Sequence, residues 1–259
     1  TFCDNRTFNP SYCQPSKSIA EQISEGKAFF ARKYTGMKYL AYFQAYSNTY
    51  ASVETLKRRY EEALSQDDVV GIIIGTRPDC VGSDVMDYLE RLNRQTFMIV
   101  EYGIESVSDQ TLLRVNRGHD FKCSRRAIAE THDRGILTCG HIILGLPGES
   151  AEENIRQSEV VSNLKLDILK LHQLQIIKGT QLAEEYCREP FKLYSADEYI
   201  DLCIRYLERL RNDIIVERFV SQSPADMLIA PKWGLKNYEF TNRLVNEMTR
   251  RGTWQGRLL

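Results

Sequence analysis

The sequence lacks long hydrophobic runs and has no clear excess of charge of either sign. Its apolar runs, such as IIIG at 72–75 and IILGL at 142–146, are far shorter than the ~20 residues that span a bilayer, which argues against a helical membrane protein. The 34 Lys and Arg residues nearly balance the 35 Asp and Glu residues, so the formal net charge is −1. That balance excludes a protein that wraps nucleic acid by bulk charge, although it allows a local basic patch.

Paired cysteines are also missing. The seven cysteines are an odd number, and no two of them form a Cys-x-x-Cys pair. A small secreted disulfide scaffold is therefore excluded, and a reducing cytoplasm is the expected location. The composition is otherwise ordinary, with 42% hydrophobic and 27% charged residues, which excludes a disordered or fibrous chain.

Several common catalytic signatures are absent as well. The four histidines show no His-x-x-x-His spacing, which disfavours a zinc hydrolase. There is no Gly-x-Ser-x-Gly elbow of a serine hydrolase and no Gly-x-Gly-x-x-Gly loop of a dinucleotide-binding fold. The turn at Gly145–Ser150 is not a phosphate-binding P-loop, because no Gly-Lys-Ser/Thr follows it.

What the chain does contain is an alternation of short β-rich runs with amphipathic helical patterns. The strand candidates, each rich in Ile, Val, Tyr, Phe or Leu, are Lys38–Ala45, Val69–Gly75, Thr96–Tyr102, Thr138–Leu144, Ile168–Gln175 and Ile214–Val220. This alternation predicts an α/β protein, and specifically an open, TIM-like barrel. A doubly wound open sheet is the alternative.

A predicted helix over Lys17–Lys33 precedes the first of these strands. Because a helix in this position normally follows a strand, we expect a first barrel strand upstream of Thr1. We therefore predict an incomplete core barrel over residues 1–188 and a C-terminal α/β extension over residues 189–259 that packs on the barrel.

Polar and small residues follow five consecutive predicted strands at their carboxyl ends. These segments are Gln44–Tyr50, Gly75–Cys80, Glu101–Ser106, Gly145–Ser150 and His172–Thr180, with His141 inside the fourth strand. Because the carboxyl ends of barrel strands meet at one face, we interpret the segments as the lining of an active site. The alternative is that they are ordinary loops, since turns favour polar residues and glycine in any protein.

Eight motifs run through the chain in a fixed order. They are TFCDN (1–5), YFQAYSNTYA (42–51), GTRPDC (75–80), EYGIES (101–106), NRGHDF (116–121), HIILGLPGE (141–149), KLHQLQIIKGT (170–180) and APKWGLKN (230–237). Together they resemble the YhcC-type branch of the radical S-adenosylmethionine (SAM) superfamily, which is similar to the Elp3 catalytic subunit. The likeness covers nearly the whole chain.

The resemblance implies a partial (β/α)6 barrel and an iron–sulfur enzyme of the oxidoreductase type. Such enzymes hold a 4Fe–4S cluster by three cysteines and bind SAM at the open iron. An electron then cleaves SAM to a 5′-deoxyadenosyl radical, which abstracts hydrogen from a substrate. Cys3 matches the last of the three cysteines, so we expect the other two upstream of Thr1. An electron donor such as a flavodoxin or ferredoxin is the expected partner.

The resemblance also implies cofactor-binding residues. Arg117 matches an arginine that pairs with the SAM carboxylate, Glu105 a contact to the ribose or methionine part, and His141 a ribose contact. Gln44 matches a position near the SAM amino group, where many relatives have Gly-Gly-Glu. The other expected cofactor-binding residues are Asn48 in the loop after the first strand, Leu144 in the adenine wall, and Gln173. We expect only one of Gln173 and Gln175 to line the bore.

The leading hypothesis is therefore a radical SAM enzyme whose substrate the sequence leaves open. An Elp3-like RNA-modifying enzyme is one alternative; the basic clusters Lys57–Arg59 and Arg250–Arg251 would serve RNA locally, but the net charge does not support it. A barrel-fold accessory or binding protein without cluster chemistry is a second alternative. A third is a lyase or isomerase that uses Glu101, Glu105 and His141 as acid–base groups. No membrane partner is expected.

Overall fold

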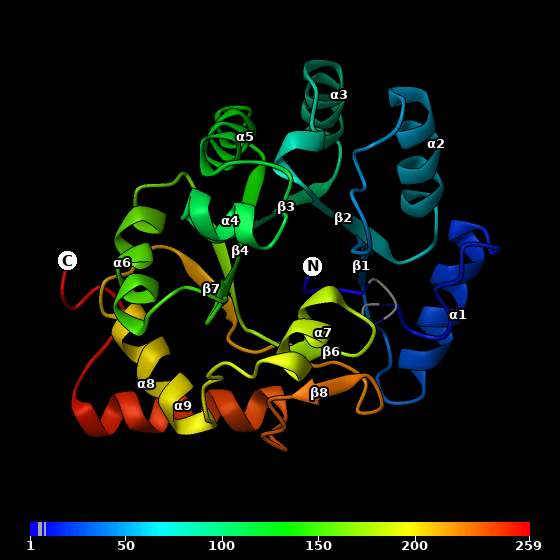
Figure 1. The fold of residues 1–259 in the computed structure, drawn as a ribbon. Coiled ribbons are helices and arrows are strands. Elements are labelled where there is room, and N and C mark those ends of the chain that lie inside the picture. Colours follow the sequence, from blue (N-terminus) through cyan, green and yellow to red (C-terminus); the bar gives the residue numbers. More distant parts are fainter. Residues whose placement is uncertain (5–6, 8) are drawn as a thin grey trace.

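The fold is built around a curled sheet of parallel strands (Figure 1). The computed structural model describes residues 1–4, 7 and 9–259. In hydrogen-bonded order, the strands of the six-stranded sheet are β1 (Tyr39–Phe43), β2 (Val69–Thr76), β3 (Phe97–Glu105), β4 (Leu137–Leu144), β5 (Ile168–Gln173) and β7 (Ile215–Arg218). All six predicted strands form, and the sheet is the expected open half-barrel. Because the strand order follows the chain without a reversal, the doubly wound alternative is wrong.

The helices lie mostly on the outer face of the sheet, and those between β1 and β5 connect successive strands (Figure 1). They are α1 (Ile19–Ala31), α2 (Val53–Leu64), α3 (Ser83–Asn93), α4 (Asp109–Arg114), α5 (Phe121–Asp133), α6 (Ala151–Ser162), α7 (Gln181–Arg188), α8 (Ala196–Leu207) and α9 (Asn237–Arg251), with a 3₁₀ turn η2 (Pro78–Cys80). Side chains such as Ser52, Asp120 and Ser150 cap free amides and fix where helices begin. Within the described residues, no helix has the length and apolar character needed to cross a membrane.

The two faces of the sheet differ in chemistry, because alternate residues of a strand point to opposite sides. The outward-facing side chains are buried against the helices in the main core and include Ile72, Ile74, Val100, Tyr102, Ile142, Leu144, Leu169 and Leu171. The concave face has a small apolar cluster near the amino ends of the strands, formed by Ile99, Cys139 and Ile168 with Ile73 packed against it. Beyond this cluster, toward the carboxyl ends of the strands, the concave face carries polar and charged side chains among apolar ones, so this is where functional groups gather.

A short antiparallel ribbon and the first residues of the chain lie at the mouth of the bore. The ribbon pairs β6 (Ile176–Ile177) with β8 (Leu228–Ala230). A second apolar cluster includes residues of β6 and α7, and the half-buried Phe2 packs against it. The Thr1 hydroxyl donates to the carbonyl oxygen of Val115 at 3.0 Å, and the Thr1 carbonyl accepts from an amide of α7 at 3.1 Å. These contacts hold the first residues beside the strand ends.

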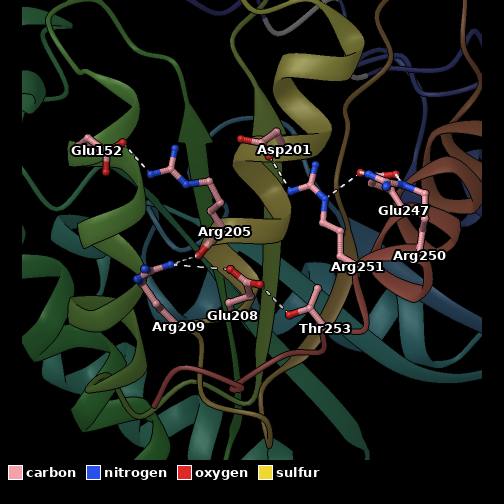
Figure 2. A network of polar contacts seen from close by, with 9 residues as sticks. All are labelled: Glu152, Asp201, Arg205, Glu208, Arg209, Glu247, Arg250, Arg251 and Thr253. Atoms are coloured by element: carbon pink, nitrogen blue, oxygen red, sulfur yellow. Dashed lines mark hydrogen bonds and ion pairs between the residues drawn. The ribbon is translucent and has the colours of Figure 1, made fainter.

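The C-terminal part of the chain joins both the sheet and the core. β7 pairs with β5, and Tyr199, Tyr206 and Phe240 from α8 and α9 are fully buried in the main core. Figure 2 shows polar contacts that join α8 and the residue after it to their neighbours, Arg205–Glu152, Arg251–Asp201 and Glu208–Thr253, and the pair Arg251–Glu247 within α9. The division at residue 188 stays a prediction, while the sheet and the core run across it.

Candidate active site

A cavity of about 450 Å³ opens at the carboxyl ends of the strands and extends along the concave face. Residues from every strand of the six-stranded sheet line it. Its volume is within the usual range for small-molecule sites. A second cavity, of about 480 Å³, lies between α4 and α6; Pro147, Gly148 and Glu149 of the predicted segment Gly145–Ser150 line it, but none of the predicted cofactor or metal ligands does. The cavity on the concave face is therefore the candidate active site.

Most of the predicted site residues meet in this cavity. The structure places Cys3, Gln44, Glu105, Arg117, His141 and Gln173 in its lining. They come from distant parts of the sequence and converge because parallel strands bring their carboxyl ends to one edge. Their assignment to individual cofactor atoms stays a prediction.

Asn48 lies outside this lining and has a different task. Its side-chain amide donates hydrogen bonds to the carbonyl oxygens of Phe43 at 2.9 Å, Ala45 at 3.0 Å and Gly75 at 2.9 Å. Both amide hydrogens are therefore used to fasten the loop after β1 to the end of β2. Asn48 thus positions the loop that carries Gln44 and contributes no free group to the cavity.

Leu144 also does not reach the cavity. Its side chain is fully buried in the main core, where Ile142 lies as well. The alternation along β4 turns His141 and Ile143 toward the bore instead, and both line the cavity. The apolar side chain of β4 that lines the cavity is therefore Ile143, where we had expected Leu144.

Irregular backbone at the end of β3 shapes the mouth of the cavity. The β3–β4 register shifts between Gly103 and Glu105, and Glu105 has a left-handed φ of 68°. A left-handed φ is uncommon for a residue other than glycine and costs conformational energy. Arg117 crosses over Gly103: its Nη2 donates to the Gly103 carbonyl oxygen at 2.6 Å and lies 3.4 Å from a Glu105 carboxylate oxygen. A Cβ at position 103 would overlap Arg117 Nη2, so this crossing requires glycine.

Arg117 keeps a free donor in this arrangement. Its side chain is 15% exposed, and its Nε is buried with no hydrogen-bond partner among the described residues. A planar guanidinium with an unused N–H suits a carboxylate, which accepts two parallel hydrogen bonds. The mouth of the cavity is thus built to receive an anionic group.

Cys3 is the cysteine that the described part of the chain places in the cavity lining. Its side chain is exposed at the mouth, yet the surrounding protein desolvates the sulfur and, with the Glu105 carboxylate, raises the pKa of the thiol. Cys139 and Cys203, by contrast, are buried in the core. An iron bound to the sulfur would deprotonate it outright and reverse this effect.

A charged layer crosses the bore below the mouth. Glu101 is 1% exposed, accepts hydrogen bonds from the Tyr42 hydroxyl at 2.5 Å and from the Lys170 ammonium, and lies 3.2 Å from His141 Nε2. Desolvation opposes the charge of Glu101, but His141 and Lys170 outweigh it and hold the pKa of this carboxyl well below its usual range. Lys170 also lies 3.1 Å from Glu217. The layer is therefore a set of paired charges.

Three groups in this region have the character of metal ligands. Atoms of Glu101, Cys139 and His141 lie within 4.8 Å of one another. Lys170 already supplies a positive charge to Glu101, and desolvation holds the pKa of the Cys139 thiol far above its usual range. The donor set therefore favours the lysine ammonium over a metal ion.

The opposite wall is formed by β5 and the segment after β7. Gln173 Nε2 donates to the Ser221 carbonyl oxygen and its Oε1 accepts from the Ser221 amide, both at 2.9 Å. Gln175 Nε2 donates to the same carbonyl oxygen at 3.1 Å. Both glutamines line the cavity, so the prediction that only one does is wrong, because residues two apart share a face of a strand. Gln173 holds this wall in place.

Sequence reasoning missed Tyr42, Gly103, Lys170 and Arg218 as site residues. A signal for Lys170 was present, because a lysine within the apolar strand ILKLHQ needs a buried partner. The matching carboxylate stands in the equally apolar strand FMIVEYGIE. Gly103 and Arg218 give no such signal, since their roles depend on local shifts in strand register.

Comparisons with known proteins identify the family. Residues 1–156 match the family model of the Radical SAM superfamily, and residues 166–250 match that of the Radical_SAM C-terminal domain. This chain belongs to the radical SAM superfamily. It is 35% identical over 257 residues to the uncharacterized protein YtqA of Bacillus subtilis, covering 99% of this chain and 80% of that protein. It is 36% identical over 234 residues to protein YhcC of Escherichia coli, covering 90% of this chain and 74% of that protein.

These relatives place the radical SAM chain in the YhcC-type branch, as its motifs indicated. A solved structure, the Methanocaldococcus infernus Elp3 with a deletion of its N-terminus, superposes with a TM-score of 0.75 at 19% identity. The match covers 92% of this chain and 59% of that one, so the chain spans less than two thirds of its length. At this identity the likeness shows a shared fold.

Membership implies an enzyme with a 4Fe–4S cluster and SAM as cofactors. The residues at the cavity mouth fit such cofactors, because Cys3 offers a thiol and Arg117 an unpartnered N–H donor for a carboxylate. A cluster held by three cysteines needs two further thiols besides that of Cys3.

Proposed function

We propose that this radical SAM protein cleaves SAM reductively and abstracts a hydrogen atom from an organic substrate held in the bore. The observation that carries the proposal is the convergence of Cys3, Glu105 and Arg117 at the mouth of one cavity. When bound, the cluster and SAM together would supply the electron and the 5′-deoxyadenosyl radical. A flavodoxin or ferredoxin would deliver the electron.

The N-terminal segment presents Cys3 as a ligand to one iron. Two sets of contacts position this segment. Thr1 is bonded to Val115 and to α7, and Phe2 packs on the second apolar cluster. The thiol is therefore left exposed and unpaired at the cavity mouth, where it is able to bind iron.

Arg117 and Glu105 would orient SAM. The guanidinium would bind the SAM carboxylate through the unpartnered Nε and a neighbouring nitrogen, and Glu105 would accept hydrogen bonds from ribose hydroxyls. The two side chains lie 3.4 Å apart before any ligand binds, so little reorganisation is needed. His141, lower on the same wall, is held by its contact with Glu101.

The charged layer would protect the radical from side reactions. Glu101 accepts hydrogen bonds from the Tyr42 hydroxyl and the Lys170 ammonium and contacts the His141 ring, so the charges of this layer are paired with one another. Desolvation and the Glu101 charge raise the pKa of Tyr42 far above its usual value, which keeps the phenol protonated. Because the charges of Glu101 and Lys170 are paired, these two groups draw little water into the bore.

The test uses the full-length protein, reconstituted without oxygen with iron and sulfide, reduced, and mixed with SAM. We expect 5′-deoxyadenosine and methionine from the wild type, and loss of both products and of the iron–sulfur absorbance in Cys3→Ala. Cys187→Ala, which removes an exposed cysteine of α7, is the control and keeps both signals. Normal cluster occupancy in Cys3→Ala would remove Cys3 from the site.

The same assay separates the competing hypotheses. A binding protein without cluster chemistry predicts no 5′-deoxyadenosine from the wild type, and a lyase or isomerase predicts turnover in air without iron. An RNA substrate stays an alternative that the net charge of −1 does not favour. Addition of tRNA to the assay would raise 5′-deoxyadenosine formation if that alternative is correct.

A further inference from the structure

The last strand of the sheet contains an irregularity that faces the cavity. Along the parallel β5–β7 pair, Leu169 is opposite Val216, but Lys170 is opposite Arg218. Glu217 is thus an extra residue, as in a β-bulge. Regular alternation would have turned Arg218 toward the helices on the side of Val216. The bulge turns it instead to the concave face, where it lines the cavity.

Arg218 differs from the other charged residues of the cavity lining in its lack of a counter-charge. The other charges are paired as Arg77–Asp79 at 2.6 Å, Arg117–Glu105 at 3.4 Å and Glu101 with Lys170. Within the described residues, no carboxylate forms an ion pair with Arg218, and its buried Nε has no hydrogen-bond partner. A guanidinium that is partly removed from water without a partner is costly to the protein unless a ligand supplies the missing anion.

A second unpartnered donor lies close to Arg218. His172 Nε2 is buried and has no hydrogen-bond partner in the part of the chain that the structure describes. Desolvation, followed by the nearby charges of His141 and Arg218, lowers the pKa of His172 well below its usual value. The ring is therefore neutral at pH 7 and offers one N–H without adding a second charge.

We propose that Arg218, with His172 beside it, binds an oxyanion group of the substrate, either a carboxylate or a phosphate. The guanidinium fork makes two parallel hydrogen bonds to either group, and the imidazole adds a third donor. This proposal rests on the proposed function, which assigns the bore to the substrate and Arg117 to the carboxylate of SAM. The bore would thus have two anion sites on different elements, one for each reactant.

The segment after β7 is held in a way that supports this assignment. Gln173 donates to the carbonyl oxygen of Ser221 and accepts from its amide, and Gln175 accepts from the Ser223 hydroxyl at 2.7 Å. These bonds join the end of β5 to the segment that follows Arg218, so the backbone beside the proposed anion site is held on both strands.

The test measures anion binding by the full-length protein without cluster or SAM, by calorimetric titration at low ionic strength. Inorganic phosphate and acetate are the two probes, and the tighter one identifies the substrate group. We expect Arg218→Gln to weaken binding of the preferred probe by at least about tenfold, the effect of losing a charge-assisted fork. Arg218→Lys keeps the charge without the fork and should give an intermediate loss.

Two control variants make the result specific. Arg257→Gln, at an exposed position near the C-terminus, should bind the probe as the wild type does. Arg125→Gln, at an exposed position of α5, should also bind the probe as the wild type does. Wild-type affinity in both Arg218 variants, or no saturable binding of either probe to the wild type, would overturn the proposal. Since neither SAM nor iron is present, this result is independent of whether SAM is cleaved.

Discussion

Gly103 is the residue on which the place of Arg117 depends. The guanidinium lies against the Gly103 backbone, and a methyl group there would occupy the position of Nη2. Both residues lie beside Glu105, whose φ is left-handed and where the register of β3 shifts. The mouth of the cavity therefore depends on a glycine, an irregular strand end and the guanidinium of Arg117. The close approach has a direct consequence for the binding of SAM.

We expect Gly103→Ala to displace the Arg117 side chain and to lower the affinity for SAM by at least about tenfold, since one charge-assisted pair is lost. Equilibrium dialysis with SAM on the reconstituted full-length protein measures the change. Gly82→Ala, at a helix N-cap of ordinary φ, is the control and should bind SAM normally. Unchanged affinity in Gly103→Ala would mean that Arg117 does not contact SAM.

Glu101 links the stability of the protein to pH. Its pKa is lowered on folding, so the folded state binds this proton less readily than the unfolded state. The stabilisation is fully present above the ordinary carboxyl pKa of about 4.3 and is lost as pH falls toward the lower folded value. We expect the free energy of unfolding to depend less on pH in this acidic range in Glu101→Gln than in the wild type. Urea unfolding at several pH values measures this, with Glu54→Gln on the surface as the control.

At the scale of elements, α9 shows which contacts hold the C-terminal part in place. Its ion pair with α8, Arg251–Asp201, and the pair Arg251–Glu247 within α9 (Figure 2) are partly exposed, and water and salt weaken such pairs. Phe240, nearer the start of the same helix, is fully buried against Tyr199 and Trp233, with ring centroids 5.6 Å and 5.8 Å away. Apolar burial should therefore dominate the docking of α9.

We expect Phe240→Ala to reduce the free energy of unfolding by about 3–5 kcal/mol, because a large cavity is left in the core. Arg251→Met, which removes the ion pairs with Asp201 and Glu247, should have a much smaller effect. Urea unfolding monitored by circular dichroism compares the two variants. A larger loss in Arg251→Met would show that the polar network, rather than the core, holds α9.

At the scale of the whole molecule, the sheet joins the two parts that the sequence suggested. The strand β7 comes from the region after residue 188, yet it pairs with β5 and carries Arg218 into the cavity. The main core also takes Tyr199, Tyr206 and Phe240 from that region. The C-terminal part is therefore needed for both the stability of the barrel and the composition of its site.

We expect a protein cut after residue 188 to lose cooperative unfolding, because it would expose the β5 edge and the residues of the main core that pack with those of α8 and α9. Thermal unfolding followed by circular dichroism tests this, with the uncut full-length protein as the reference. A sharp transition in the shortened protein would show that the barrel folds without its last strand.

Much of the fold was accessible from local patterns. The runs around Ile72–Ile74 and Ile142–Leu144 are apolar without alternation, as expected of strands buried on both faces, and the parallel order follows from the helices between them. Ordered motifs such as EYGIES and HIILGLPGE indicated the family and, with it, Cys3 and Arg117 as site residues. These features depend on short stretches of sequence, which the chain carries whatever its tertiary environment.

Only the tertiary structure decided which side chains share the cavity. Leu144 faces the helices and Asn48 is used within its loop, although both stand in matching motifs. Arg218 reaches the bore because one bulge reverses the alternation of β7, and Glu101 meets Lys170 across β4. Register and bulges are set by contacts between strands distant in sequence, so no local pattern reveals them. The sequence by itself determined the strands, their order and the family; packing determined the partners of each charge in the site.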